Sequence, residues 1–180
     1  MQKTEVENKV QEVSPTDVGR LTLDDGRSPF VHLHVHSMYS LSDALSTPKQ
    51  IVAKAKALGF DAIALTDHRG LYGAVDFYEA CQKEGLKAII GVEADLAPNS
   101  LHDKRARIDD WTYHITLLAE NFTGYQNLLQ LVSISYLEGF YYEARMDKEH
   151  LKKYHEGIIA LSGCMKGEIP KACNEGDLEK

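Results

Sequence analysis

The first regular pattern in the chain is an alternation of apolar residues and histidines between positions 31 and 36. Its members are Val31, His32, Leu33, His34, Val35 and His36. Successive side chains of a β-strand point to opposite faces, so this period of two predicts a strand with one apolar face and one histidine face.

A helix is predicted after this strand, because the sequence carries the signals of a helix start. Thr47 is a suitable N-cap, Pro48 suits the first helical position, and Gln50 completes a capping box. Gly59 is the residue at which we expect the helix to end. Its apolar face is formed by residues at helical spacing: Ile51, Val52, Ala55 and Leu58.

Short apolar runs and longer amphipathic runs then alternate along the chain. The runs expected to be strands are 61–66, 87–93, 113–119 and 158–162. The runs expected to be helices are 71–84, 123–137, 147–155 and 168–173. This alternation is typical of an α/β protein with parallel strands. Residues 95–112 are polar and irregular, which predicts a loop.

Composition and charge narrow the kinds of protein that the sequence could encode. The chain has 180 residues, 43% of them hydrophobic and 26% charged, with a net charge of −7. These values are typical of a soluble globular domain. The mixed charges of residues 1–28 predict a flexible tail without a secretory signal, which leaves 29–180 as the folded domain. No apolar run is long enough for a bilayer, so no membrane partner is expected.

The cysteines and the charge balance bear on location and partners. The cysteines are Cys81, Cys164 and Cys173, and they form no CxxC pair. An odd number without such a pair argues against a disulfide framework and predicts a cytoplasmic protein. The chain has no strongly basic stripe, which argues against tight, sequence-independent DNA binding by this chain alone. An acidic balance instead suits a site for divalent cations.

Potential metal ligands fall near the ends of the predicted strands, where α/β folds bind their ligands. His114 is an exception, because it lies at the start of the predicted strand 113–119. The other six lie at the ends of their strands or in the loops that follow them: His34, His36, Asp43, His68, Glu93 and Cys164.

Ligands of these types suit zinc, manganese or iron, and a carboxylate such as Glu93 can bridge two ions. Two ions roughly 3.5–4 Å apart can activate a water molecule and stabilise the attacking and leaving oxygens of a phosphoester. His34 and His36 would point the same way from a strand, so they could share one metal cluster.

Several of these residues also have a purely structural interpretation. His32 could pack or support a ligand, Asp43 could be a turn residue, and Cys164 could be a small buried side chain. Asp67 could cap its loop or support a ligand. GxGxxG, Walker A and GxSxG patterns are absent, so no competing catalytic motif is present. The grouping of ligand types at successive strand ends favours the metal site.

Four long stretches of the sequence resemble the PHP domain of bacterial DNA polymerase III alpha subunits. The resemblance extends from about residue 30 to about residue 170. The stretches are FVHLHVHSMYSLSDA, ALTDHRGLYGAVDFYEACQKEGLKAIIGVEADLAP, HITLLAENFTGYQNLLQLVSISYLEGFYYEARMD and IIALSGCMKGEIP.

The resemblance implies a distorted (β/α) barrel that holds up to three divalent metal ions. Two further ligands, an aspartate and a histidine, would follow Lys180, so 29–180 is expected to be the first part of an incomplete barrel. The sequence has Asp43-Ala44 where the family usually has DG, and His68-Arg69-Gly70 where it usually has HGN. The implied metal ligands are His34, His36, Asp43, His68, Glu93, His114 and Cys164.

The function expected from these residues and from the resemblance is metal-dependent hydrolysis of a phosphoester, with 3′ nucleotides removed in proofreading. Glu93, His34 and His36 would take part through the bound metal, and Arg69 or Arg145 could hold a phosphate. The expected partners are the 3′ end of DNA, reached through a full-length polymerase, and other replisome subunits. Two alternatives are a catalytically silent docking module of the polymerase and a free-standing phosphatase of the histidinol phosphatase type.

Overall fold

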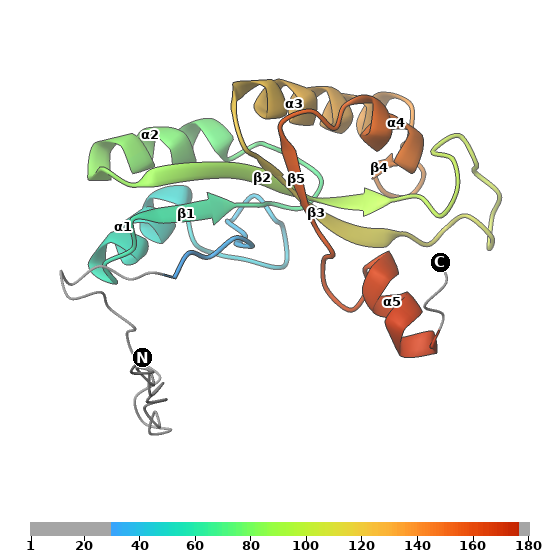
Figure 1. Cartoon of the computed structure of the whole chain (residues 1–180), viewed down its shortest axis with the longest axis horizontal. Helices are drawn as coiled ribbons and strands as arrows, with labels where there is room; N and C mark the ends of the chain where they lie inside the picture. The colour runs from blue at the N-terminus through green and yellow to red at the C-terminus, as the bar shows by residue number, and fades with distance from the viewer. Residues whose placement is uncertain (1–29, 177–180) are drawn as a thin grey trace, which may run out of the picture.

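The computed structural model describes residues 30–176, so the predicted tail 1–28 and position 29 lie outside the described residues. Within 30–176, helices pack around one curved sheet and alternate with its strands except between β2 and β3 (Figure 1). The strands are β1 (Ala62–Leu65), β2 (Lys87–Leu96), β3 (Tyr113–Ala119), β4 (Arg145–Met146) and β5 (Ile158–Leu161). The helices are α1 (Pro48–Ala57), α2 (Ala74–Glu84), α3 (Phe122–Leu137), α4 (Lys148–Lys153) and α5 (Glu168–Glu175).

The predicted α/β class is confirmed, but the sheet is mixed rather than parallel. Its order is β1-β2-β3-β5, with β4 paired to β2. β2 runs parallel to β1 and β4, whereas β3 runs antiparallel to both β2 and β5. A parallel crossover usually needs a helix, and the connection between β2 and β3 contains none. β3 is therefore the one reversed strand of the described sheet.

Residues 31–37 do not form the regular strand that their alternation predicted. They lie along β1, where Ala64 N donates to His32 O (2.9 Å) and Thr66 N donates to Val35 O (2.8 Å). The two acceptors are three positions apart in the sequence but the two donors are only two positions apart, so the register slips by one residue. The Val35 N–H donates instead to the Thr66 hydroxyl oxygen (2.9 Å). The segment is extended, but it cannot build a regular ladder.

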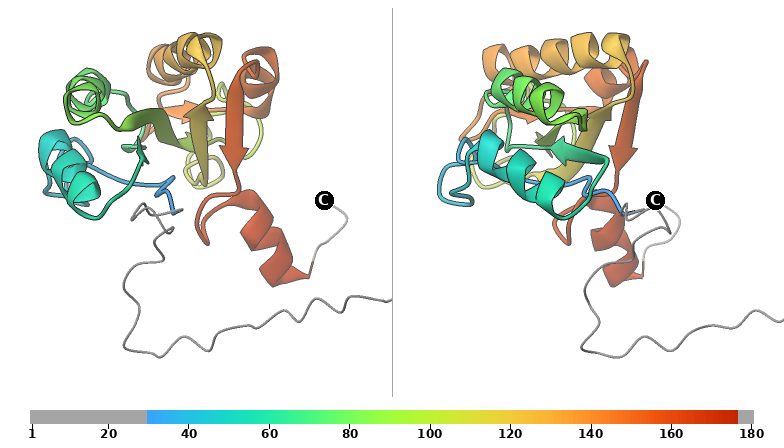
Figure 2. Two further views of the ribbon diagram at one scale, coloured as in Figure 1. Left: turned by 60° about the vertical axis from the view of Figure 1, so that its left-hand side comes forward. Right: turned by 90° about the vertical axis from the view of Figure 1, so that its left-hand side faces the viewer.

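Helix α1 begins where its start signals predicted it and ends two residues before Gly59. The capping box at α1 is present, with Gln50 N donating to Thr47 Oγ1 (3.2 Å) and Thr47 N donating to Gln50 Oε1 (2.9 Å). Gly85 ends α2 in the left-handed conformation (φ 68°). Figure 2 shows α1, α2, α3 and α4 in an arc around the outside of the curved sheet, as in an open section of a barrel. No helix within residues 30–176 is long and apolar enough to cross a bilayer.

Two apolar clusters join the helices to the sheet. One is built around α1, α2 and β1 and includes Val52, Leu65 and Phe77. The other lies between α3 and the strands β2 and β3. Burying a leucine or phenylalanine contributes about 2 kcal/mol. The second cluster has seven fully packed members: Val92, Ala94, Leu96, Leu117, Leu128, Leu131 and Met146.

Arg145 of β4 is fully buried, and it holds the loop between β2 and β3 in place. Its guanidinium donates to four backbone carbonyls. The acceptors are the oxygens of Leu101 (3.1 Å), Asp103 (2.9 Å), Asp109 (2.8 Å) and Gly139 (3.1 Å). The suggested role of Arg145 in holding a phosphate is therefore wrong, because the guanidinium is enclosed by the chain's own backbone.

The loop after β1 turns through a left-handed residue at Arg69 (φ 60°). This conformation costs a residue with a Cβ roughly 1–2 kcal/mol, which explains why glycine suits the position. The Arg69 side chain forms ion pairs with Asp95 and with Glu143 (Nη1 to Oε2, 3.0 Å). Ala44 is not left-handed, and the positive φ of its loop falls on Ser42 (73°). Residue 44 therefore needs no glycine.

Replacing Arg145 by Met tests its role in the fold. The change removes the donor shared by four carbonyls, three of them in buried hydrogen bonds, so the free energy of unfolding should fall by about 3 kcal/mol or more in urea denaturation. The matched control is Arg107→Met, at an exposed position of the same loop, which should change the value by less than about 0.5 kcal/mol. Equal effects of the two substitutions would contradict the assignment.

The backbone at Arg69 is tested by comparing Arg69→Gly with Arg69→Ala. Both variants lose the ion pairs, but only glycine relieves the left-handed conformation. Arg69→Gly should therefore be about 1 kcal/mol more stable than Arg69→Ala in urea denaturation. Lys54, exposed in α1, is the control: there glycine should be less stable than alanine by about 1 kcal/mol. If the glycine variant were more stable than the alanine variant at both positions, or less stable at both, the result would argue against strain at residue 69.

Candidate metal centre

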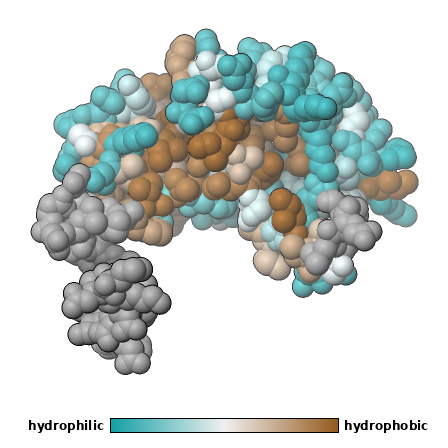
Figure 3. Space-filling view, viewed as in Figure 1, coloured by the Kyte–Doolittle hydropathy of each residue, from teal (hydrophilic) through white to brown (hydrophobic). Residues whose placement is uncertain are grey.

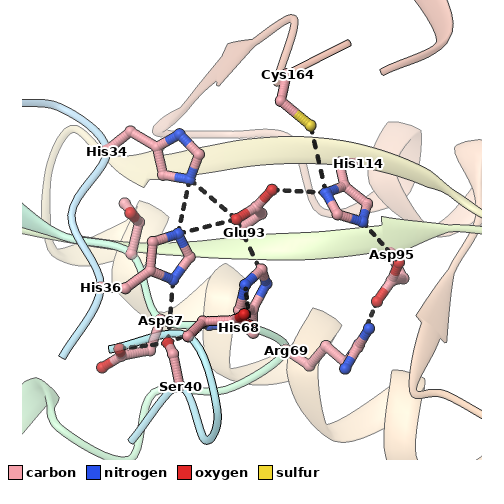
Figure 4. A network of polar contacts seen from close by, with 12 residues as sticks. His34, His36, Ser40, Asp67, His68, Arg69, Glu93, Asp95, His114 and Cys164 are labelled. Carbon is pink, nitrogen blue, oxygen red and sulfur yellow. Dashed lines mark hydrogen bonds and ion pairs between the residues drawn. The ribbon is translucent and has the colours of Figure 1, made fainter. Parts of the chain in front are cut away.

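The seven predicted ligands come from six segments of the chain and lie in one cluster. Figure 4 shows all of them except Asp43 with labels. Each segment contributes at least one ligand. The segments are 31–37, the loop after it, the end of β1, β2, β3 and the turn after β5. In chain order the ligand candidates are His34, His36, Asp43, His68, Glu93, His114 and Cys164.

Glu93 lies at the centre of the cluster, on β2, and only 4% of its surface is exposed. Its Oε2 is 2.9 Å from His34 Nε2, 3.0 Å from His36 Nε2 and 3.4 Å from His68 Nδ1. Its Oε1 is 2.7 Å from His114 Nδ1. The two carboxylate oxygens therefore face two different groups of side chains.

The backbone brings His68 to Glu93 by extending the pairing of β1 with β2. Glu93 N donates to Asp67 O (3.1 Å), and Arg69 N donates to Glu93 O (2.8 Å). His68 and Glu93 thus form a parallel bridge just beyond the end of β1. Asp43 joins the cluster through His68, with its Oδ2 3.1 Å from His68 Nε2.

The reversed direction of β3 explains how His114 reaches the site. His114 lies at the start of β3, and its register partner is Asp95 near the end of β2. An antiparallel strand begins where its neighbour ends, so the exception among the predicted ligands lies at the same rim as the others. The strand-end rule had assumed a parallel β3.

Cys164 comes close to His114 because of the glycine before it. Gly163 has φ 77°, and a Cβ at that position would lie 2.5 Å from the carbonyl oxygen of His114. Only glycine allows this approach without displacing the backbone. Cys164 Sγ then lies 3.5 Å from His114 Nδ1, and the thiol is exposed.

The charge state of the cluster suits cation binding. Burial by itself would raise the pKa of Glu93, but the hydrogen bonds with His36 and His34 and the nearby His34 and His68 outweigh it. The pKa of Glu93 is therefore well below its usual value, and the carboxylate is ionised at neutral pH. Burial also lowers the pKa of His68, although Glu93 opposes the shift. A neutral imidazole is the form that binds metals.

The donor atoms form two groups that fit metal ions. His34 Nε2, His36 Nε2 and Glu93 Oε2 are each 2.9–3.0 Å from one another. Ligand atoms about 2.0–2.2 Å from a tetrahedral zinc ion lie about 3.3 Å apart, so this triangle resembles one face of such a site. The second group is Glu93, His114 and Cys164. The residues present therefore fit divalent metals, with Glu93 common to both groups.

Asp95 is a member of the site that the sequence interpretation missed. It is buried, and its Oδ1 is 3.7 Å from His114 Nε2 and accepts from the Thr112 hydroxyl (2.5 Å). Its Oδ2 accepts from Arg69 Nε, which places the Arg69 guanidinium at the edge of the cluster (Figure 4). Asp95 could have been found from its spacing, because residues i and i+2 of a strand share a face.

His32 does not join the cluster. Its ring centroid lies 4.7 Å from that of Phe30 and 5.4 Å from that of Phe60, in edge-on contacts. The packing interpretation of His32 is therefore confirmed.

A cavity of about 600 Å³ lies between α2 and α3, away from the ligand cluster. It includes Ala88 at the start of β2 and Ala119 at the end of β3, whereas His114 lies at the opposite end of β3. On the face shown in Figure 3, apolar side chains gather in the middle, while the outer surface of α3 and α4 is mostly polar. The cavity lining is mainly apolar and contains none of the predicted metal ligands.

Comparison with known proteins gives the family. Residues 32–180 match the family described as PHP domain. The DNA polymerase III subunit alpha of Borreliella burgdorferi is 51% identical over 146 residues, which is 81% of this chain and 13% of that protein. The subunit of the same name from Treponema pallidum is 48% identical over 151 residues, 83% of this chain and 13% of that protein.

Among solved structures, a two-domain protein from Bacteroides vulgatus is described as containing a predicted PHP-like metal-dependent phosphoesterase. It is 18% identical, with a TM-score of 0.45, and the match covers 82% of this chain and 41% of that one. The chain spans about 13% of the length of the two polymerase subunits that it matches. On the extent of the family match and the identity to these relatives, the chain belongs to the PHP domain family.

Proposed function

We propose that this chain is a metal-dependent phosphoesterase domain that removes nucleotides from the 3′ end of DNA. The observation that carries the proposal is the sharing of one buried carboxylate, Glu93, between two groups of ligand atoms. A carboxylate placed in this way can bridge two ions at the spacing that phosphoester hydrolysis uses, roughly 3.5–4 Å.

The ligand atoms divide between the two oxygens of Glu93. His34 and His36 would hold one ion with Oε2, and His114 and Cys164 would hold a second with Oε1. His68 lies next to the first group through its contact with Glu93, and Asp43 lies next to His68. Zinc, manganese and iron suit this mixture of imidazole, carboxylate and thiolate. Bound divalent ions would supply an activated water and stabilise charge on a phosphoester.

The DNA substrate is proposed from the named relatives, which are subunits of DNA polymerase III. With a net charge of −7, the chain is poorly suited to gripping DNA by charge alone. We therefore propose that the rest of a polymerase presents the 3′ end, with other replisome subunits as partners in the cytoplasm. Arg69, at the edge of the ligand cluster, would contact the phosphate.

Metal content tests the site directly. The purified chain, loaded with zinc, manganese or iron and then desalted, should retain two or more ions by elemental analysis. His34→Ala/His36→Ala should lose at least one, because it removes two of the three ligands of the first group. The matched control is His102→Ala/His155→Ala, which removes two exposed histidines outside the cluster and should keep the full content. A loaded wild-type chain without metal would contradict the proposal.

The reaction is tested with a 3′-labelled single-stranded DNA and with histidinol phosphate. The metal-loaded chain should release 3′ nucleotides, and EDTA or the His34→Ala/His36→Ala substitution should abolish the release. The substitution should reduce the rate of nucleotide release by more than the 10–100-fold typical of changing a residue that only hydrogen-bonds to a metal ligand. Stoichiometric metal without hydrolysis would identify a docking module instead. Turnover of histidinol phosphate but not DNA would identify a small-molecule phosphatase.

A further inference from the structure

Tyr72 is an exposed aromatic residue on the loop between β1 and α2, four positions after His68. The backbone on both sides of it is anchored. Leu71 packs against the apolar cluster of α3, β2 and β3, and the buried Ala74 begins α2. Tyr72 itself is 59% exposed. Its side chain is therefore available to a ligand, although its backbone is fixed by packing.

The Tyr72 ring is held in place from two directions. Its hydroxyl donates to the hydroxyl of Tyr136 on α3 (2.9 Å), a residue 64 positions away in the sequence. A Cβ at Gly70 would lie 2.3 Å from Tyr72 Cε2 and 2.7 Å from Cδ2, so one side of the ring lies directly against the backbone of residue 70. A ring held in this way loses little further freedom when a ligand contacts it.

The tyrosine pair borders the candidate metal centre at Arg69. Arg69 N donates to Glu93 O (2.8 Å), and its side chain pairs with Asp95 at the edge of the ligand cluster (Figure 4). Burial and the Tyr72 hydroxyl raise the pKa of Tyr136 to about 12, while the charge of Arg69 opposes this shift. Tyr136 is therefore close enough to Arg69 to sense its charge, and it is neutral at neutral pH.

Charge alone gives this border little attraction for a nucleic acid. Arg69 is already paired with two carboxylates, those of Asp95 and Glu143, and the chain has a net charge of −7. A nucleotide held here needs a contact that does not depend on neutralising phosphates. Stacking of a base on an aromatic ring is such a contact, and one stacked base typically strengthens binding about 5–150-fold.

We propose that Tyr72 is the platform on which the base of the 3′-terminal nucleotide stacks, and that Gly70 and Tyr136 are positioning residues for its ring. The identity of the ligand rests on the proposed function. Stacking uses the π-face that all bases share, so the platform would accept any of the four. This tolerance suits a site that must remove whichever nucleotide stands at the 3′ end.

The alternative is that the two tyrosines only join the loop to α3. A purely structural contact predicts that loss of the Tyr72 ring affects all substrates equally. The stacking role predicts a loss confined to substrates that carry a terminal base. Tyr78 is a matched control, because it is also an exposed tyrosine (52%) but lines the apolar cavity between α2 and α3.

The first arm of the test detects the contact by NMR without requiring turnover. The full chain, with zinc added, is titrated with deoxyadenosine 5′-monophosphate and, separately, with deoxyribose 5-phosphate, which lacks the base. The ring protons of Tyr72 should shift upfield with the nucleotide, because a stacked base places them in its ring current. They should not shift with the sugar phosphate, and those of Tyr78 should move with neither. Unmoved Tyr72 resonances at millimolar nucleotide would overturn the proposal.

The second arm compares hydrolysis of a 3′-terminal deoxyadenosine with hydrolysis of a 3′-terminal abasic nucleotide. Tyr72→Ala should raise KM for the adenine end about 5–150-fold, with a much smaller change in kcat, because stacking holds the bound substrate and the transition state alike. For the abasic end, KM should change by less than about threefold, because no stacked base is lost. Tyr78→Ala should alter neither value. Equal effects of Tyr72→Ala on the two ends would reduce the tyrosine to a structural role.

Two further variants separate the presence of the ring from its position. Gly70→Ala keeps the tyrosine but places a Cβ 2.3 Å from Tyr72 Cε2, so the ring must move and KM for the adenine end should rise as in Tyr72→Ala. Tyr72→Phe keeps the ring and should retain most of the affinity. These two variants decide the proposal if Tyr72→Ala does not fold. A wild-type chain that neither holds metal nor releases nucleotides would refute the proposed function, while the titration would still decide whether Tyr72 stacks a base.

Discussion

The folded chain is organised around one buried negative charge. A carboxylate as enclosed as Glu93 is strongly unfavourable unless hydrogen bonds or positive charge compensate it. The compensation comes from side chains that are distant in sequence, so the first segment, β1, β2 and β3 must all be correctly placed before Glu93 is satisfied. The arrangement of the sheet therefore brings the candidate ligands together, and these ligands in turn compensate the buried charge of Glu93.

Much of the site could be predicted from residue types at strand ends, because that rule follows from the geometry of parallel strands. It brings His68 and Glu93 together without any knowledge of the fold, although β2 continues three residues beyond Glu93. It misplaces His114, because the direction of β3 depends on a connection without a helix. The polar, irregular residues 95–112 carried that signal, since a parallel return normally needs a helix in between.

Other features depend on tertiary contacts that local patterns do not encode. The alternation at 31–37 has the period of a strand, but the register slip at Thr66 prevents a regular ladder. Arg145 and Arg69 both look like surface cations in the sequence. One is enclosed by carbonyl oxygens and the other is paired with carboxylates beside the ligands. Only the position of each in the folded chain shows that Arg145 is enclosed by the backbone, whereas Arg69 lies at the edge of the ligand cluster.

The way in which Arg145 holds the loop between β2 and β3 has a consequence for sequence variation. The guanidinium binds only main-chain oxygens in this loop, those of Leu101, Asp103 and Asp109. Every amino acid supplies such an oxygen, so substitutions in the loop can change its surface chemistry without losing these bonds. Related proteins could therefore diversify this loop extensively while the ligand cluster stays intact, provided that the arginine itself is retained.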